Sequence, residues 1–149
     1  MLDLILASTH HLLVFALAAA IAAELVLLRP GLAGEAIGRL ARIDRAYGGL
    51  AGAVILVGIA RVIFGLKSWE FYVHNPLFWA KMAAFAAVGL VSIQPTRIIL
   101  RWNRESRING ATPVPDAELA TIRAYVVAQA AIFALIPVLA AAMARGIGY

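Results

Sequence analysis

The chain has no cysteine, only three histidines and few charged residues. Without thiols it can form neither disulfides nor thiolate metal centres, which also excludes iron–sulfur clusters and thiol catalysis. Charged residues make up 14% of the 149 residues, whereas hydrophobic residues make up 63%. A water-soluble domain of this size needs more polar surface, so the composition predicts a protein whose solvent is the lipid bilayer.

Four long apolar stretches fill most of the sequence. They cover about residues 4–28, 46–66, 76–100 and 119–144, and each is long enough to cross a hydrocarbon core of ~30 Å. Backbone groups in lipid must be satisfied within their own segment, which favours helices. We therefore expect one all-α domain over residues 1–149, an integral membrane four-helix bundle. The first stretch lacks a basic start, so we expect a retained helix and not a cleaved signal peptide.

Positive charge is concentrated in two of the three connections, at about 29–45 and 101–118. The arginines in and beside them are Arg29, Arg39, Arg42, Arg45, Arg97, Arg101, Arg104 and Arg107. The positive-inside rule places both connections in the cytoplasm and both termini in the periplasm, for a multi-pass protein of the bacterial inner membrane. The net charge of +5 therefore indicates membrane topology and not a nucleic-acid partner.

The connections themselves have some predicted structure. About residues 36–43 form a possible short amphipathic helix, with Ile37, Leu40 and Ile43 on one face, and we expect it to lie on the membrane surface. Asp116 is a candidate N-cap for the last span.

Four ionisable side chains lie inside the predicted spans near the outer membrane face: His10, His11, Arg61 and Lys81. At 1.5 Å per helical residue, all four lie within roughly 10 Å of that face. Such groups are kept inside a membrane mostly where they face a bundle interior, bind a ligand or move protons. The coincidence of depth predicts one functional layer, with Lys81 and Arg61 as candidate catalytic and cofactor-binding residues.

Simpler explanations exist for the same residues. The long side chains of Lys81 and Arg61 can extend to the membrane interface. The histidines can be satisfied locally, by carbonyls or by hydroxyls such as those of Ser8 and Thr9. His10 and His11 are adjacent and point about 100° apart, so only one of them is expected to face a shared pocket.

Further polar residues lie deeper. Glu24 returns to the helix face of His10 about 21 Å lower, where it either pairs with Arg45 or Arg97 or belongs to a proton path. Other polar side chains that can line the same interior are Ser92, Thr96, Tyr125 and Gln129.

A neutral imidazole in an apolar helical bundle is a good axial ligand for haem iron. We expect His10, with His11 as the alternate, to ligate haem b, and Arg61 and Lys81 to pair with its propionates. His74 lies in the outer connection, so ligation by histidines from two spans is not available. Zinc or copper would need more clustered ligands.

Motifs along nearly the whole chain resemble a family of small four-helix bacterial membrane proteins known only as a domain of unknown function. The motifs are HHL at 10–12, Glu24, DRAYG at 44–48, GIARV at 58–62, FYVHNP at 71–76, FWAKM at 78–82 and SIQPT at 92–96. The resemblance implies the four-helix architecture and brings no established activity.

A more distant resemblance is to the HemJ-type protoporphyrinogen oxidases and the copper-resistance-type four-helix membrane proteins. In that enzyme family a first-helix histidine binds haem b and a third-helix lysine is needed for activity, and His10 and Lys81 occupy the corresponding places. The resemblance implies a haem ligand at His10 and a functional lysine at Lys81. The family's later histidines and its Asn-Glu-x-Pro pattern have no counterpart here.

Three functions follow as hypotheses. The first is a haem-b-binding redox protein that carries out tetrapyrrole oxidation or quinone-linked electron transfer. The second is a non-enzymatic accessory or scaffold subunit of a larger membrane complex, or a homo-oligomer, in contact with membrane lipids. The third is a small proton-coupled transporter that uses His10, Glu24, Arg61 and Lys81.

Overall fold

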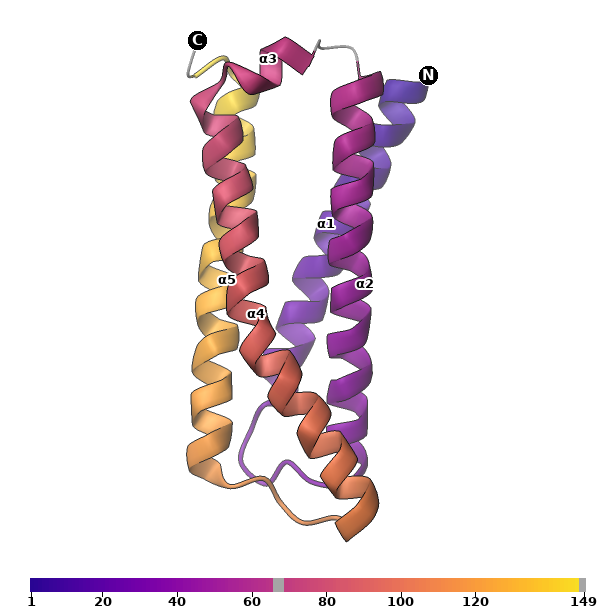
Figure 1. Ribbon diagram of the computed structural model, residues 1–149, viewed down its shortest axis with the longest axis vertical. Coiled ribbons are helices and arrows are strands. Elements are labelled where there is room, and N and C mark those ends of the chain that lie inside the picture. Colours follow the sequence, from indigo (N-terminus) through magenta and orange to yellow (C-terminus); the bar gives the residue numbers. More distant parts are fainter. Residues whose placement is uncertain (66–68, 148–149) are drawn as a thin grey trace.

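The computed structural model describes residues 1–65 and 69–147, and in those residues every regular element is a helix. The elements are α1 (Leu2–Leu27), α2 (Glu35–Phe64), α3 (Trp69–Val73), α4 (Pro76–Asn109) and α5 (Asp116–Ala144), shown in Figure 1. All but the short α3 are long and apolar enough to cross a membrane. The prediction of an all-α bundle with four membrane helices is confirmed.

The bundle consists of two helical hairpins. α1 packs closely on α2 and α4 on α5, whereas contacts between the hairpins, α2 with α4 and α1 with α5, are fewer. Figure 1 shows both termini and α3 at one end of the molecule, which we call the terminal end, and the other two connections at the opposite end, the loop end. The hairpins converge toward the loop end (Figure 1).

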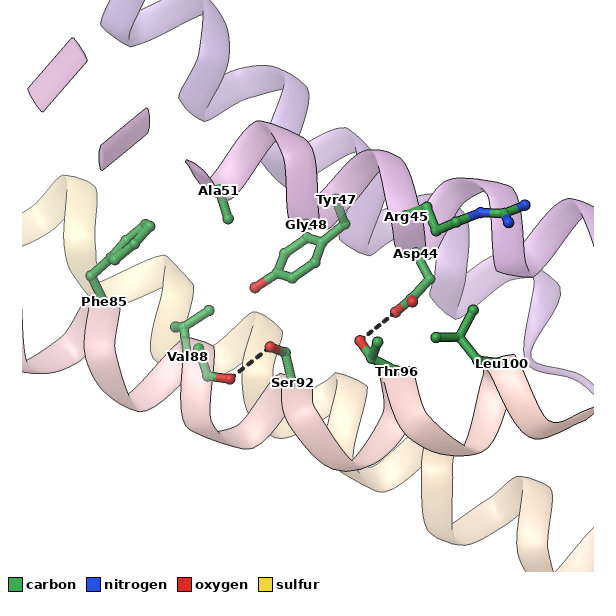
Figure 2. Close-up of a pocket in the computed structure, with 11 residues that line it drawn as sticks. Asp44, Arg45, Tyr47, Gly48, Ala51, Phe85, Val88, Ser92, Thr96 and Leu100 are labelled. Carbon is green, nitrogen blue, oxygen red and sulfur yellow. Dashed lines mark hydrogen bonds between the residues drawn. The ribbon is translucent and has the colours of Figure 1, made fainter. Parts of the chain in front are cut away.

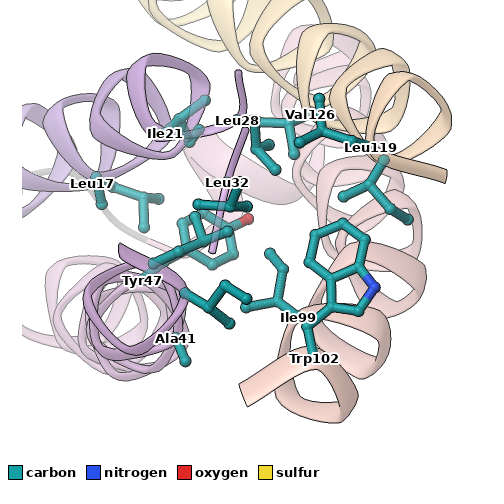
Figure 3. Packing of buried hydrophobic residues seen from close by; sticks show 14 of the residues in the cluster. Leu17, Ile21, Leu28, Leu32, Ala41, Tyr47, Ile99, Trp102, Leu119 and Val126 are labelled. Carbon is teal, nitrogen blue, oxygen red and sulfur yellow. The ribbon is translucent and has the colours of Figure 1, made fainter. Parts of the chain in front are cut away.

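The hydrophobic core lies in the half of the bundle next to the loop end. Its members include Leu17, Leu40, Ile99 and Val126, which are fully buried, with the Tyr47 ring among them (Figure 3). In the half next to the terminal end, no residue of the described stretches 2–16, 55–65, 76–87 and 137–147 is fully buried, and the buried exception beside them is the polar Asn75, which caps α4. One half is therefore close-packed, and the other exposes its apolar side chains to lipid.

Polar contacts hold the loop end together. The Val114 amide donates a hydrogen bond to the Leu32 carbonyl at 2.9 Å, which joins the two connections. The Glu118 carboxylate accepts from the Arg101 guanidinium and, at 3.1 Å, from Trp102 Nε1. These contacts hold the start of α5 against α4.

The helices extend further than the predicted spans, so the predicted loops 29–45 and 101–118 are wrong in their bounds. α2 begins at Glu35 and α4 continues to Asn109, and the connections that remain are residues 28–34 and 110–115. Hydropathy detects the part of a helix that crosses lipid and not the turns that continue beyond it.

The segment predicted as a separate surface helix forms the first turns of α2. Its apolar residues Ile37 and Leu40 are buried, because this face packs on the protein's own core and not on the membrane surface. Asp116 is the first residue of α5, and Pro115 takes the N-cap position predicted for Asp116.

α4 changes direction in its middle, and the part that ends at Asn109 crosses toward α2 (Figure 1). Pro95 lies inside this helix and is buried. Proline has no N–H to donate and its ring crowds the preceding turn, which bends helices. The bent helix brings Ser92 and Thr96 alongside α2 (Figure 2).

Candidate functional site

His10 lies against a glycine of the neighbouring helix. A Cβ placed on Gly58 of α2 would be 3.5 Å from His10 Cε1 and 3.9 Å from His10 Nδ1, so the imidazole rests on bare backbone. His10 Nδ1 is buried and has no hydrogen-bond partner among the described residues. A buried imidazole nitrogen without a partner needs an explanation, and a role in binding a ligand is one.

Two cations share the surroundings of His10. The charges of Arg61 on α2 and Lys81 on α4 both act on the His10 ring, and Arg61 also acts on Lys81. Arg61 Nε is buried and unpaired within the described part of the chain. Lys81 Nζ lies 5.4 Å from the centroid of the Phe78 ring, a cation–π distance. We call His10, Arg61 and Lys81 the basic cluster. Its members come from three helices, α1, α2 and α4.

His11 does not join the basic cluster. It is exposed, and its Nδ1 lies 2.7 Å from the Ala7 carbonyl oxygen one turn earlier. The two imidazole rings are 6.4 Å apart at an interplanar angle of 88°. The structure thus selects His10 over His11 as the residue that faces the bundle interior.

A second set of polar residues lies inside the close-packed half of the bundle. Glu24 is 2% exposed, Asp44 4% and Gln129 1%. We call the set the acidic cluster. It consists of Glu24 of α1, Asp44 and Tyr47 of α2, Ser92 and Thr96 of α4, and Gln129 of α5. All four long helices therefore contribute to it.

Two hydroxyl groups of the acidic cluster are hydrogen-bonded. Thr96 Oγ1 donates to Asp44 Oδ1 at 2.7 Å, and Ser92 Oγ donates to the Gly89 carbonyl at 2.7 Å. The Tyr47 hydroxyl points into the space between α2 and α4, where these side chains line a cavity of about 220 Å³ (Figure 2).

Other polar atoms of the acidic cluster have no partner. Glu24 Oε1, Asp44 Oδ2 and Gln129 Nε2 are buried and lack a hydrogen bond to any described residue. The predicted pairing of Glu24 with Arg45 or Arg97 is not seen among the described residues, and the charged neighbour that acts on Glu24 is Asp44. The polar interior predicted for Ser92, Thr96 and Gln129 is present.

Sequence reasoning missed Asp44 and Tyr47 as interior residues. Asp44 fell inside the predicted loop 29–45, and Tyr47 at the margin of the predicted span. Their signal was the continuation of the apolar face of Ile37 and Leu40, because steps of three and four residues lead to both of them. Tyr125, expected in the same interior, is 40% exposed.

The four apolar helices define a class, the multi-pass helical membrane proteins. A family model described as "Predicted membrane protein (DUF2214)" matches residues 2–148, and the chain belongs to this family. The recognition of a domain-of-unknown-function family from the sequence is thereby confirmed. Neither a curated protein nor a solved structure matches the chain.

Proposed function

We propose that the protein is a haem-b-binding membrane protein of redox type, in which His10 would hold the haem iron. The observation that supports this function is the buried, unpartnered His10 Nδ1 beside the charges of Arg61 and Lys81. A bound haem supplies one-electron transfer.

The residues present fit such a group in charge. Haem carries two propionates, and the basic cluster offers two cations at the depth of the imidazole. Charge-assisted hydrogen bonds from Arg61 and Lys81 would orient the propionate edge and offset the cost of keeping these cations among apolar helices. The described residues of stretches 2–16, 55–65, 76–87 and 137–147 are not fully buried, so haem binding at this end would not have to open the hydrophobic core.

The test is an absorption spectrum of the detergent-purified protein, as isolated and after titration with haemin. We expect a Soret band that is lost in His10→Ala and retained in His11→Ala, which is a matched control because the neighbouring imidazole is exposed. A wild-type protein that takes up no haem, or equal loss in both variants, would contradict the proposal.

A further inference from the structure

The acidic cluster has no part in haem binding, yet its arrangement is that of a ligand site. We infer that it binds one monovalent cation, Na⁺ or a proton, between the carboxylates of Glu24 and Asp44. Both carboxylates are nearly inaccessible, and each keeps one oxygen that no described residue hydrogen-bonds.

The buried carboxylates of this cluster lack compensating positive charge. Two carboxylates that act on each other inside an apolar bundle are costly unless positive charge compensates them. The cation that acts on Asp44 is Arg45, which also lines the cavity and whose guanidinium extends away from the Asp44 carboxylate (Figure 2). No ion pair joins Glu24 or Asp44 to a cationic side chain in the part of the chain that is described. Arg45 offsets one of the two negative charges, so the cluster lacks one further positive charge.

A neutral residue from another helix supplies a second, independent observation. Gln129 of α5 is 1% exposed, and its Nε2 has no partner among the described residues. Its side chain lies near the Tyr47 hydroxyl, whose surroundings also contain Glu24 and Asp44. The Nε2 group is a donor and does not bind a cation, but a turn of the amide plane by 180° puts the amide oxygen, which can, in its place.

The hydroxyl oxygens of Thr96 and Ser92, beside the cavity, remain free to accept. Thr96 gives its proton to Asp44 and Ser92 gives its proton to Gly89, so the oxygen lone pairs of both stay available. The cavity of about 220 Å³ beside them has room for a small ion with water, since a water molecule occupies about 30 Å³.

The donor set selects the class of ligand. It contains only oxygens, which suit hard cations and protons and not soft metals. Within the described residues, no three His, Cys, Asp or Glu side chains gather as a metal site would need, and two carboxylates beside Arg45 match a single charge better than a double one. Around the ion, α1 contributes Glu24, α2 contributes Asp44, Arg45 and Tyr47, and α4 and α5 contribute the neutral Ser92, Thr96 and Gln129.

The experiment measures the melting temperature Tm of the purified full-length protein in two arms. In one, NaCl replaces choline chloride at constant ionic strength and pH; in the other, pH falls in choline chloride alone. We expect Tm to respond in the arm that supplies the bound ion, Na⁺ or the proton. There, each tenfold rise in the concentration of that ion above its Kd should raise Tm by roughly 3–6 °C. Glu24→Gln and Asp44→Asn should lose this response, and Glu35→Gln, on an exposed residue paired with Arg39, should keep it.

The outcomes separate cleanly. A response to sodium that both variants lose identifies Na⁺, and a response to pH that both variants lose identifies a proton. No response in either arm, or one that Glu24→Gln and Asp44→Asn retain, overturns the inference. If these two variants do not fold, Thr96→Val tests the site with both carboxylates in place, and an unchanged response there counts against it. None of these readouts uses haem, so failure here is distinct from failure of the proposed function.

Discussion

A residue without a side chain sets the position of the candidate haem ligand. Because Gly58 has no Cβ, the His10 imidazole can lie directly on α2, where the charges of Arg61 and Lys81 reach it. A position of this kind constrains the neighbouring helix as strictly as it constrains the histidine. Two predictions follow at this scale.

Gly58→Leu should displace the His10 ring, because a branched side chain would occupy the space that the ring fills. We expect haem titration of this variant to give no Soret band. Gly58→Ala is the control, because its Cβ would meet His10 Cε1 at 3.5 Å, an ordinary van der Waals contact. If the Gly58→Leu variant binds haem like the wild type, haem binding does not depend on the packing of His10 against Gly58.

Arg61→Gln and Lys81→Gln should each weaken haem binding while leaving the shape of the spectrum unchanged, because they remove propionate partners and not the iron ligand. Loss of a hydrogen bond to a charged group costs about 1.5–3 kcal/mol, which corresponds to roughly a 10- to 150-fold rise in Kd. Haem titration followed by absorbance measures it, with the exposed Arg104→Gln as control. Unchanged haem affinity in both variants would show that Arg61 and Lys81 do not bind the propionates.

The depth of these residues follows from the sequence, because the position of a charge in a span is counted directly along a helix. The sequence predicts the acidic cluster poorly. Glu24 is recognisable as a charge inside the first predicted span. Asp44 lies outside every predicted span, because α2 begins earlier than predicted, at Glu35. The missing information was where a helix continues beyond lipid, and packing decides this more than hydropathy does.

At the scale of elements, one arginine side chain of α5 binds the C-terminal end of α1. Arg123 of α5 donates from Nη1 to the carbonyl oxygens of Leu25 and Leu28, each at 2.7 Å. The last carbonyls of a helix have no partner within it, so a side chain from another helix that reaches them fixes both the end of α1 and its place against α5. This contact crosses between the two hairpins at the level where they converge.

Arg123→Met should lower the free energy of unfolding by about 1–3 kcal/mol, because two carbonyl groups lose their donor and the methionine keeps most of the apolar stem. Thermal melting in detergent measures the change. Arg104→Met, on an exposed arginine of α4, should melt like the wild type. Equal melting temperatures for all three proteins would mean that water or lipid headgroups satisfy these carbonyls equally well.

At the scale of the whole molecule, the chain has two ends of different character. The loop end carries the packed core, the acidic cluster and most of the arginines, and the terminal end carries the basic cluster. The sequence predicts this polarity through its arginines, and the positive-inside rule then predicts that the loop end faces the cytoplasm.

The natural absence of cysteine makes this orientation measurable. In intact cells, Glu70→Cys in α3 should react with a membrane-impermeant maleimide, whereas Thr112→Cys in the connection 110–115 should react only after permeabilisation. Both positions are exposed, so access from one side of the membrane is what differs. The reverse labelling pattern would place the basic cluster on the cytoplasmic side.

The separation of the packed core from the basic cluster has an evolutionary consequence. Most substitutions that destabilise a protein do so by disturbing close packing, and such packing is confined to one half of this bundle. Changes around His10 should thus accumulate at little thermodynamic cost. The surroundings of His10 can in this way change while the opposite half keeps the chain folded.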